Sequence, residues 1–258
     1  MFSMRVGIAK LGAIASAVLI EYCLDELAIR EDLETFVVSS GSKIRIDVLD
    51  ELERREFDLK IITCPNAEKF LRPNMISGRV IVITDKASKD WLESIEWGYI
   101  VVKADSMIGA RREFLDPTEM VLYNSDLLRV LAVTGVFRLI QFEIDRALKE
   151  DYLPRVVVDY GKALEFSGFS NPYARAKAMA SYIIAETISK ITHRACFIER
   201  DTEKFITLCA TAHELMRIAG ILADSAREIE KSNDTVLRTP HSRSGEILKK
   251  VGLYDLLM

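Results

Sequence analysis

About the first 105 residues alternate short apolar segments with amphipathic ones, and this alternation constrains the fold more than any other feature. The apolar segments are rich in valine and isoleucine, as β-strands are, and comprise residues 5–9, 35–38, 59–63, 79–84 and 99–102. The stretches of helical character between them are residues 13–28, 46–57 and 87–96. Because strands that alternate with helices pair in parallel through right-handed crossovers, we predict an α/β fold with a mostly parallel, Rossmann-like sheet.

The rest of the chain has the pattern of helices. Asp116 can cap a helix, Pro117 suits its first position and Glu119 completes a capping box, so a helix is predicted to begin there. We expect it to reach about residue 149, with a weak point at Thr134-Gly135. Further helices are predicted over residues 172–191 and 201–231, and short extended pieces over 155–158 and 196–199. Two domains are expected: a sheet domain, residues 1–104, and a helical domain, residues 105–258.

Composition excludes several classes of protein. The chain has 35 Lys and Arg against 39 Asp and Glu, a net charge of −4, whereas general nucleic-acid binders carry a basic excess. The cysteines form no CxxC pair and the three histidines fit no zinc motif, so we expect reduced cysteines and no metal. No apolar run approaches the ~18 residues of a membrane span. The run at residues 11–20 fits a helix after a first strand better than a signal peptide.

In open parallel sheets ligands bind beyond the carboxyl ends of the strands, which directs attention to the loops at residues 10–16, 39–43, 64–70, 85–88 and 103–109. Gly12 either makes a sharp turn or lets a ligand approach a helix amino terminus. A nucleoside-triphosphate loop is excluded, because Ala13-Ile14 stand where Lys-Ser/Thr is required. The loop Ser39-Ser-Gly-Ser-Lys43 is either an anion-binding loop or an ordinary polar one.

Polar residues elsewhere leave alternatives open. The charged segment Lys103–Pro117 is either an ion-pair hinge or a recognition site for a heterocycle or an acidic tail. His213 lies on one flank of the predicted third helix with Arg217 and Asp224, as a structural or a functional residue. The segment Arg238–His241 either folds over a cleft or braces a subunit contact. We predict a solvated stripe on the helix after Pro117, formed by Thr134, Arg138, Gln141 and Asp145. No GxSxG motif supports nucleophilic catalysis.

Four longer stretches, residues 98–117, 171–180, 211–216 and 226–241, have a more specific character. They include Gly-Ala-Arg-Arg-Glu-Phe-Leu-Asp-Pro ending at Pro117, Asn-Pro-Tyr-Ala-Arg-Ala-Lys beginning at Asn171, and Leu-Arg-Thr-Pro-His ending at His241. These stretches closely resemble the archaeal methylenetetrahydromethanopterin dehydrogenases that use the deazaflavin coenzyme F420. The resemblance runs in register over nearly the whole chain, and the chain is identified as a member of that family.

The resemblance implies an enzyme of archaeal one-carbon metabolism, such as methanogenesis, that is cytoplasmic and homo-oligomeric. It implies reversible hydride transfer between the methylene carbon of a tetrahydromethanopterin-type carrier and the deazaflavin ring, without metal, nucleic acid or membrane. Since the coenzyme carries the chemistry, the protein mainly orients two rings, and no catalytic side chain is expected. The expected carrier-binding residues are Lys103, Asp105, Arg111, Arg112, Glu113, His213, Glu214, Arg217 and His241. The expected coenzyme-binding residues are Gly12, Ser16, Gly41, Ser42, Lys43, Pro65, Asn66 and Asp85.

Three strand-end loops depart from the family pattern. The first reads Lys10-Leu-Gly-Ala-Ile-Ala-Ser-Ala17 where the family has approximately Lys-Cys-Gly-Asn-Ile-Gly-Thr-Ser. The loop after the third strand keeps Pro65-Asn66 but not the prolines that follow in the family. Charged residues now stand in these loops, namely Glu68, Lys69, Lys86 and Lys89. Two further hypotheses are therefore a divergent paralogue that binds the pterin but not the deazaflavin, and a non-catalytic oligomeric binding protein.

Overall fold

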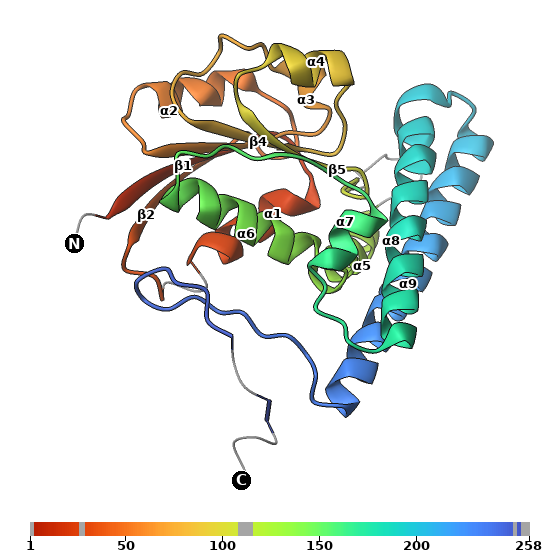
Figure 1. Ribbon diagram of the computed structural model, residues 1–258. Coiled ribbons are helices and arrows are strands. Elements are labelled where there is room, and N and C mark those ends of the chain that lie inside the picture. The colour runs from red at the N-terminus through yellow and green to blue at the C-terminus, as the bar shows by residue number, and fades with distance from the viewer. Residues whose placement is uncertain (1–2, 26–28, 108–115, 250–251, 254–258) are drawn as a thin grey trace. The chain divides into compact units, whose positions relative to one another are not determined.

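The computed structural model describes residues 3–25, 29–107, 116–249 and 252–253, and divides the chain into two compact units (Figure 1). The sheet unit comprises residues 1–103, 138–158 and 239–249, and the helical unit comprises residues 104–137, 159–238 and 250–258. The expected single boundary after residue 104 is therefore too simple. Residues 138–158 return to the sheet unit because they supply a helix and a sixth strand.

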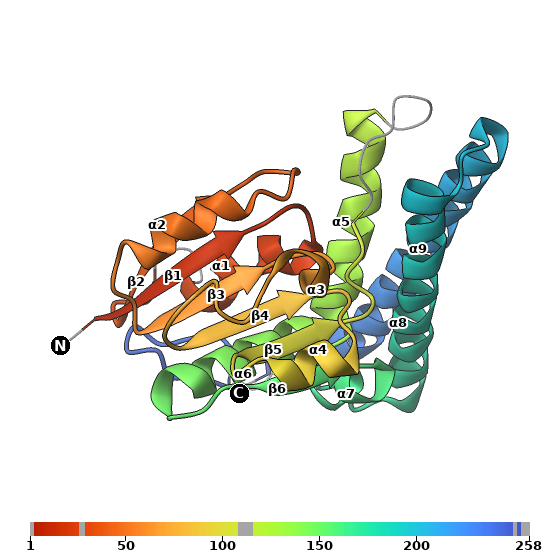
Figure 2. The ribbon, with the colours of Figure 1, turned by 90° about the horizontal axis from the view of Figure 1, so that it is seen from above.

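The sheet unit is built on a six-stranded sheet with all described neighbours parallel, in the order β2-β1-β3-β4-β5-β6 (Figure 2). The strands are β1 (Met4–Lys10), β2 (Leu33–Ser39), β3 (Leu59–Thr63), β4 (Val80–Thr84), β5 (Gly98–Val102) and β6 (Arg155–Val158). The α/β fold class and the five early strands are thus confirmed. Every residue of β3 and β4 is buried, as in parallel strands covered on both faces.

Helices cover both faces of this sheet (Figure 1). One face carries the 3₁₀ turn η1 (Ile46–Leu49) with α2 (Asp50–Glu53), α3 (Ala67–Phe70) and α4 (Lys89–Ser94). The other face carries α1 (Ala15–Asp25) and α6 (Val136–Lys149). The core beneath α2–α4 is continuous from Leu52 through Ile62 and Val82 to Leu92. This packing fixes the carboxyl ends of the strands, where ligand-binding loops are expected.

The helical unit contains α5 (Pro117–Val133), α7 (Tyr160–Glu165), α8 (Pro172–His193), the π-helical turn η2 (Arg194–Ile198) and α9 (Thr202–Ser232). Side chains cap these helices: Asp116 accepts from Glu119 N, as the sequence indicated, Asp159 from Lys162 N, Asn171 from Tyr173 N and Asp201 from Lys204 N. The extended piece expected at residues 196–199 is wrong, because α8 continues directly into η2. Short α7 was not anticipated.

Helix α9 is long and apolar enough to cross a membrane by length and composition alone. This differs from the expectation that no segment has such a composition. Its apolar stripe, including Phe205, Ala212 and Met216, is buried, and the helix packs against α8 and α5. A helix buried in the core of a globular unit can have the same length and composition, so these two properties alone do not make α9 a membrane span.

The break between α5 and α6 occurs at Gly135, as the weak point at Thr134-Gly135 predicted. Gly135 has φ +103°, a conformation that residues with a Cβ rarely adopt. A Cβ atom there would lie 2.6 Å from the backbone nitrogen of Ser167 and 2.8 Å from the carbonyl carbon of Phe166. The glycine therefore lets the α5 end approach the backbone after α7 closely.

A buried polar cluster replaces the solvated stripe predicted on α6. Gln141 and Asp145 are each 3% exposed. Asp145 Oδ1 accepts from Arg30 Nη1 at 3.0 Å, and Asp145 Oδ2 lies 2.6 Å from His241 Nε2. Arg30 also pairs with Asp32 at 2.6 Å, just before β2 begins. We call Arg30, Asp32, Asp145 and His241 the Arg30 cluster.

The Arg30 cluster holds residues 239–249 at the amino-terminal edge of the sheet. The backbone NH of Glu31 donates to Arg243 O at 2.8 Å, and Lys149 Nζ donates to Gly245 O at 2.9 Å. His241 was expected to bind the carrier. Instead it is buried among Arg30, Gln141 and Asp145, at the edge opposite the strand carboxyl ends. His241 thus has internal partners and helps to hold residues 239–249 against the sheet unit.

Glu230 is the corresponding buried carboxylate of the helical unit. It is fully buried near the end of α9 and accepts from Asn171 N at 2.7 Å, Ser170 Oγ at 2.9 Å and Thr235 Oγ1. Burial alone would raise the pKa of Glu230, but the hydrogen bonds, led by that from Thr235, hold it below the ordinary value of 4.5. The ionised carboxylate thus ties the start of α8 to the end of α9.

Glu230→Gln is expected to weaken the acid sensitivity of the fold. Because the pKa is lower in the folded than in the unfolded state, ionised Glu230 stabilises the fold above the ordinary pKa. This contribution is lost as the pH falls through the folded value. Urea unfolding between about pH 5 and pH 2 should show a shallower loss of stability in the variant than in the wild type. Glu228→Gln, which changes an exposed carboxylate on the same helix, should retain the wild-type slope.

Candidate ligand site at the carboxyl edge of the sheet

The strand order places the crevice of this sheet between β1 and β3. From β1 the chain proceeds to β2 on one side and then returns to β3 on the other. Such a reversal is the point where open α/β sheets bind ligands, beyond the carboxyl ends of the strands. The last paired residues there are Lys10 of β1 and Thr63 of β3. Lys10 Nζ is held by Glu21 of α1 at 3.2 Å.

Loops after β1, β2 and β3 meet at Gly12. The Gly12 NH donates to Ser40 Oγ at 3.2 Å, and the Ser40 NH donates to Lys10 O at 3.0 Å. Gly12 has φ +68°, and a Cβ there would lie 2.7 Å from Ile44 Cγ1 and 3.2 Å from Pro65 Cγ. The glycine is needed both for its backbone conformation and for the close approach of its neighbours. We call this contact of Gly12 with Ser40, Ile44 and Pro65 the three-loop junction.

The expected coenzyme-binding residues occupy this edge in different environments. Gly41 has φ +66°, and nothing lies within 4 Å of the position a Cβ would take. Ser42 and Lys43 beside it are exposed. Ser16 is fully buried in the first turn of α1. The structure therefore brings Gly12 and Pro65 into contact and leaves residues 41–43 open to solvent next to them.

Asn66 and Asp85 link the loops after β3 and β4. Asn66 adopts the left-handed conformation, φ 49°, and its NH donates to Asp85 Oδ1 at 2.7 Å. Among the described residues, Asn66 Oδ1 and Thr63 Oγ1 are both buried without a hydrogen-bond partner. Burial, with the Asp85 carboxylate, raises the pKa of Cys64 to about 12, so this thiol stays protonated and is no nucleophile.

Thr63 is a residue that the sequence reasoning missed. The only indication in the sequence was a threonine at the end of an otherwise apolar strand. Threonine is also an ordinary β-branched strand residue, so this position did not stand out. A buried hydroxyl without a partner costs about 1–3 kcal/mol of stability. Such an unpaired buried group in a fold calls for an explanation, such as a bound ligand or an ordered water.

The expected carrier-binding residues are spread over both units. Lys103 follows β5 and is exposed, while Asp105 in the helical unit is fully buried. Arg111, Arg112 and Glu113 lie outside the described residues.

On α9, the residues predicted to share one flank make two separate contacts with α5, one through His213 and one through Asp224. His213 Nδ1 lies 3.6 Å from Glu119 Oε2, and its ring centroid is 5.1 Å from that of Tyr123. Burial lowers the pKa of His213 despite the Glu119 carboxylate. Asp224 pairs instead with Arg129, at 3.3 Å. Glu214 and Arg217 are exposed.

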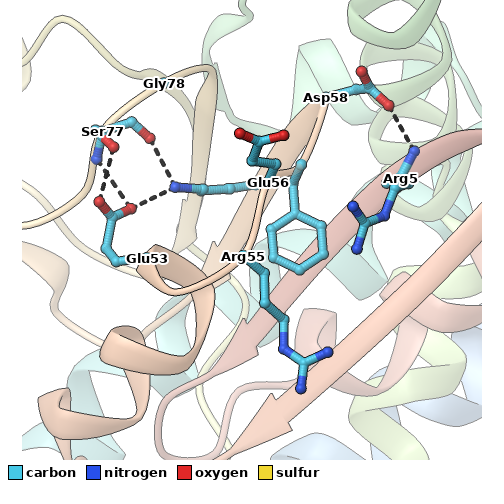
Figure 3. A pocket seen from close by; sticks show the side chains of 9 residues that line it. Arg5, Glu53, Arg55, Glu56, Asp58, Ser77 and Gly78 are labelled. Atoms are coloured by element: carbon cyan, nitrogen blue, oxygen red, sulfur yellow. Dashed lines mark hydrogen bonds and ion pairs between the residues drawn. The ribbon is translucent and has the colours of Figure 1, made fainter.

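A hollow of about 540 Å³ lies at the opposite, amino-terminal edge of the sheet unit (Figure 3). The Glu53 carboxylate there accepts hydrogen bonds from Lys60 Nζ and, at 2.8 Å, from Ser77 Oγ. Three cationic and three acidic residues balance, so the hollow selects no ligand charge: Arg5, Arg55, Lys60, Glu53, Glu56 and Asp58. In the part of the chain that the structure describes, no group of three or more His, Cys, Asp or Glu side chains could hold a metal ion.

An open parallel sheet with small and polar loops gathered at its switch point is the architecture of α/β proteins that bind nucleotide-like or flavin-like coenzymes. The family model for methylene-5,6,7,8-tetrahydromethanopterin dehydrogenase matches residues 4–257. The chain belongs to this family.

Similar proteins cover the chain almost completely. The F420-dependent methylenetetrahydromethanopterin dehydrogenase of Archaeoglobus fulgidus is 52% identical over 96% of this chain and 97% of its own length. The enzyme of Methanothermobacter marburgensis is 43% identical over the same shares. A solved F420-dependent dehydrogenase in complex with methylene-tetrahydromethanopterin and coenzyme F420 superposes with a TM-score of 0.90, at 39% identity and 98% coverage of both chains. The family and fold predicted from the sequence are confirmed.

Proposed function

We propose that this chain catalyses reversible hydride transfer between the methylene carbon of methylenetetrahydromethanopterin and coenzyme F420. The observation that carries this function is full-length similarity to F420-dependent dehydrogenases, one of them solved with both ligands. When bound, the coenzyme supplies the ring carbon that accepts or returns the hydride. The protein's part is to bind two rings and orient them, which by itself accounts for large rate accelerations.

The coenzyme site is proposed at the carboxyl edge between β1 and β3. The residues are Gly12, Ser16, Gly41, Ser42, Lys43, Pro65, Asn66 and Asp85. Three features support this placement: the three-loop junction, the open space at Gly41 and the orphaned acceptor of Asn66. Gly41 lets a ligand approach the backbone, and the exposed Lys43 amine beside it suits an anionic group.

The carrier is proposed to bind Lys103, Asp105, Arg111, Arg112, Glu113, His213, Glu214 and Arg217. His213 supports this best, because its burial favours the neutral imidazole, which can accept a hydrogen bond as well as donate one. His241 is not included, since the Arg30 cluster holds it.

Steady-state turnover tests the function. Purified protein mixed with methylenetetrahydromethanopterin and coenzyme F420 should bleach the absorbance of the oxidised deazaflavin, with a rate that saturates in both ligands. A folded protein that binds the carrier and leaves F420 unreduced would support the alternative of a divergent paralogue. A folded protein that binds neither would support the non-catalytic alternative. Charged residues in the altered loops motivate these alternatives, whereas the F420-dependent relatives favour the dehydrogenase.

We also propose a homo-oligomer in the cytoplasm, without nucleic-acid or membrane partners. Large apolar side chains are exposed on the helices of the helical unit, among them Leu122 of α5, Ile183 of α8 and Ile221 of α9. The described cysteines Cys23, Cys64 and Cys209 are buried and form no disulfide, which suits a reducing compartment. Light scattering should give a mass above that of one 29.2 kDa chain, and a monomer at micromolar concentration would contradict the assembly.

Gly12→Ala is expected to weaken coenzyme binding by about tenfold, the equivalent of about 1.4 kcal/mol. The new methyl group meets Ile44 and Pro65, so the loops after β1, β2 and β3 must separate. Gly78→Ala is the matched control, because Gly78 has φ +83° but open space around the added methyl, at the far edge of the sheet. Fluorescence titration with F420 should show weaker binding for Gly12→Ala only. Equal F420 affinities for the two variants would show that the three-loop junction is not part of the coenzyme site.

A further inference from the structure

Strands β3 and β4 both end in a fully buried threonine, and the two hydroxyls differ in their hydrogen bonds. Thr84 Oγ1 at the end of β4 accepts from the Ala67 NH at 3.1 Å and donates to Lys86 O at 3.1 Å. Thr63 Oγ1 at the end of β3 has no partner among the described residues. Valine has the same shape and would fill the Thr63 position without burying an unpaired hydroxyl. Local packing therefore accounts for Thr84 but gives no reason for a hydroxyl at Thr63.

The position of Thr63 supplies that reason. It is paired with Lys10 at the switch point between β1 and β3, where open parallel sheets bind ligands. Three residues further on, Asn66 Oδ1 is also buried without a donor. Two orphaned polar groups thus follow each other at the end of one strand. One is a hydroxyl that can donate or accept, and the other is a carbonyl that only accepts.

We propose that Thr63 is a coenzyme-positioning residue whose hydroxyl donates to a carbonyl of a cyclic amide edge, while Asn66 Oδ1 accepts from the adjacent ring N–H. A deazaflavin carries such an edge, and so does a pterin. The inference rests on the proposed coenzyme site, which assigns this edge to F420. Because Thr63 is fully buried, contact with a ring requires the residues that cover it to move. A bound ring would accept a hydrogen bond from the Thr63 hydroxyl and so remove the free-energy cost of leaving that hydroxyl unpaired.

Thr63→Val, Thr63→Ser and Thr84→Val test the proposal through ligand-free stability and ligand affinity. Thr63→Val should keep or raise the wild-type Tm without ligand and weaken F420 binding by about tenfold, with methylenetetrahydromethanopterin binding unchanged. Thr63→Ser, which keeps the hydroxyl, should bind F420 within about threefold of wild type. Thr84→Val, which removes a satisfied hydroxyl, should lower Tm.

Three outcomes overturn the proposal. Unchanged F420 affinity in Thr63→Val shows that the hydroxyl touches no ligand. A fall in Tm like that of Thr84→Val shows a structural hydroxyl. A loss of carrier affinity in place of F420 affinity assigns the edge to the pterin. Failure of the wild-type protein to bind F420 at all contradicts the proposed function itself, and the wild-type titration in the same series shows this separately.

Discussion

Replacing Asp145 with alanine is expected to lower the free energy of unfolding by about 3–5 kcal/mol, the usual cost of breaking a buried ion pair from one side. Asp145 Oδ1 accepts a hydrogen bond from Arg30 Nη1 at 3.0 Å, and Asp145 Oδ2 lies 2.6 Å from His241 Nε2. The side chains of Arg30 and Asp145 are only 1% and 4% exposed. Without this carboxylate, Arg30 keeps only Asp32 as an acidic partner among the described residues. The pKa of Arg30 reflects the same balance: burial lowers it, and Asp32 and Asp145 together raise it above its ordinary value.

Urea unfolding at pH 7 measures this effect, and Asp47→Ala provides the control. Asp47 also pairs with an arginine, Arg45, but both side chains are largely exposed. Exposed ion pairs contribute little to stability, so no measurable change is expected for Asp47→Ala. Similar midpoints for the two variants would show that the Arg30 cluster does not hold the end of the chain against the sheet unit.

Gly135→Ala should be nearly as damaging, with an expected loss of about 4 kcal/mol or more from backbone strain and steric overlap together. Gly135 has φ +103°, and the added methyl would overlap backbone atoms of residues 163–167. Backbone atoms cannot swing aside as side-chain ends do, so the turn between α5 and α6 must distort. Gly78→Ala, at φ +83° with open space, separates the conformational strain from the overlap. Thermal unfolding should rank Gly135→Ala far below Gly78→Ala, and a similar Tm for both would contradict the close approach.

Local patterns were sufficient for most of the fold. Strands β1, β3 and β4 follow from continuous apolar runs, and the starts of α5 and α8 follow from Asp116 and Asn171, since capping depends on residues three positions apart. Pairing of distant segments was not available from such patterns. The sequence showed an extended piece at Arg155–Val158, but nothing in it shows that this piece pairs with β5.

Polar residues were the harder part for the same reason. The helical spacing placed Gln141 and Asp145 on one face correctly, but the face is buried because residues 239–249 return to cover it. His241 was assigned to the carrier because its segment is so specific to the family, whereas its contacts are internal. Gly12 was open to two interpretations, a turn or a ligand contact. The structure supplies a reason for the turn in the packing of Ile44 and Pro65 around it.

The altered first loop also has a physical interpretation. Alanines at positions 13 and 15 replace the polar and glycine residues of the family pattern. Gly12 and Pro65 are retained, and a Cβ at Gly12 would lie 3.2 Å from Pro65 Cγ. The contact that organises the loops after β1 and β3 is therefore kept while neighbouring side chains have changed. This retention supports the proposed placement of F420 at the carboxyl edge.

A single-turnover experiment with methylenetetrahydromethanopterin deuterated at its methylene carbon tests the central claim most directly. The account predicts that the enzyme reduces F420 and that mass spectrometry finds the deuterium in the reduced coenzyme, because the two rings are held for direct transfer. Deuterium released to water, or a folded protein that binds both ligands without reducing F420, would contradict it.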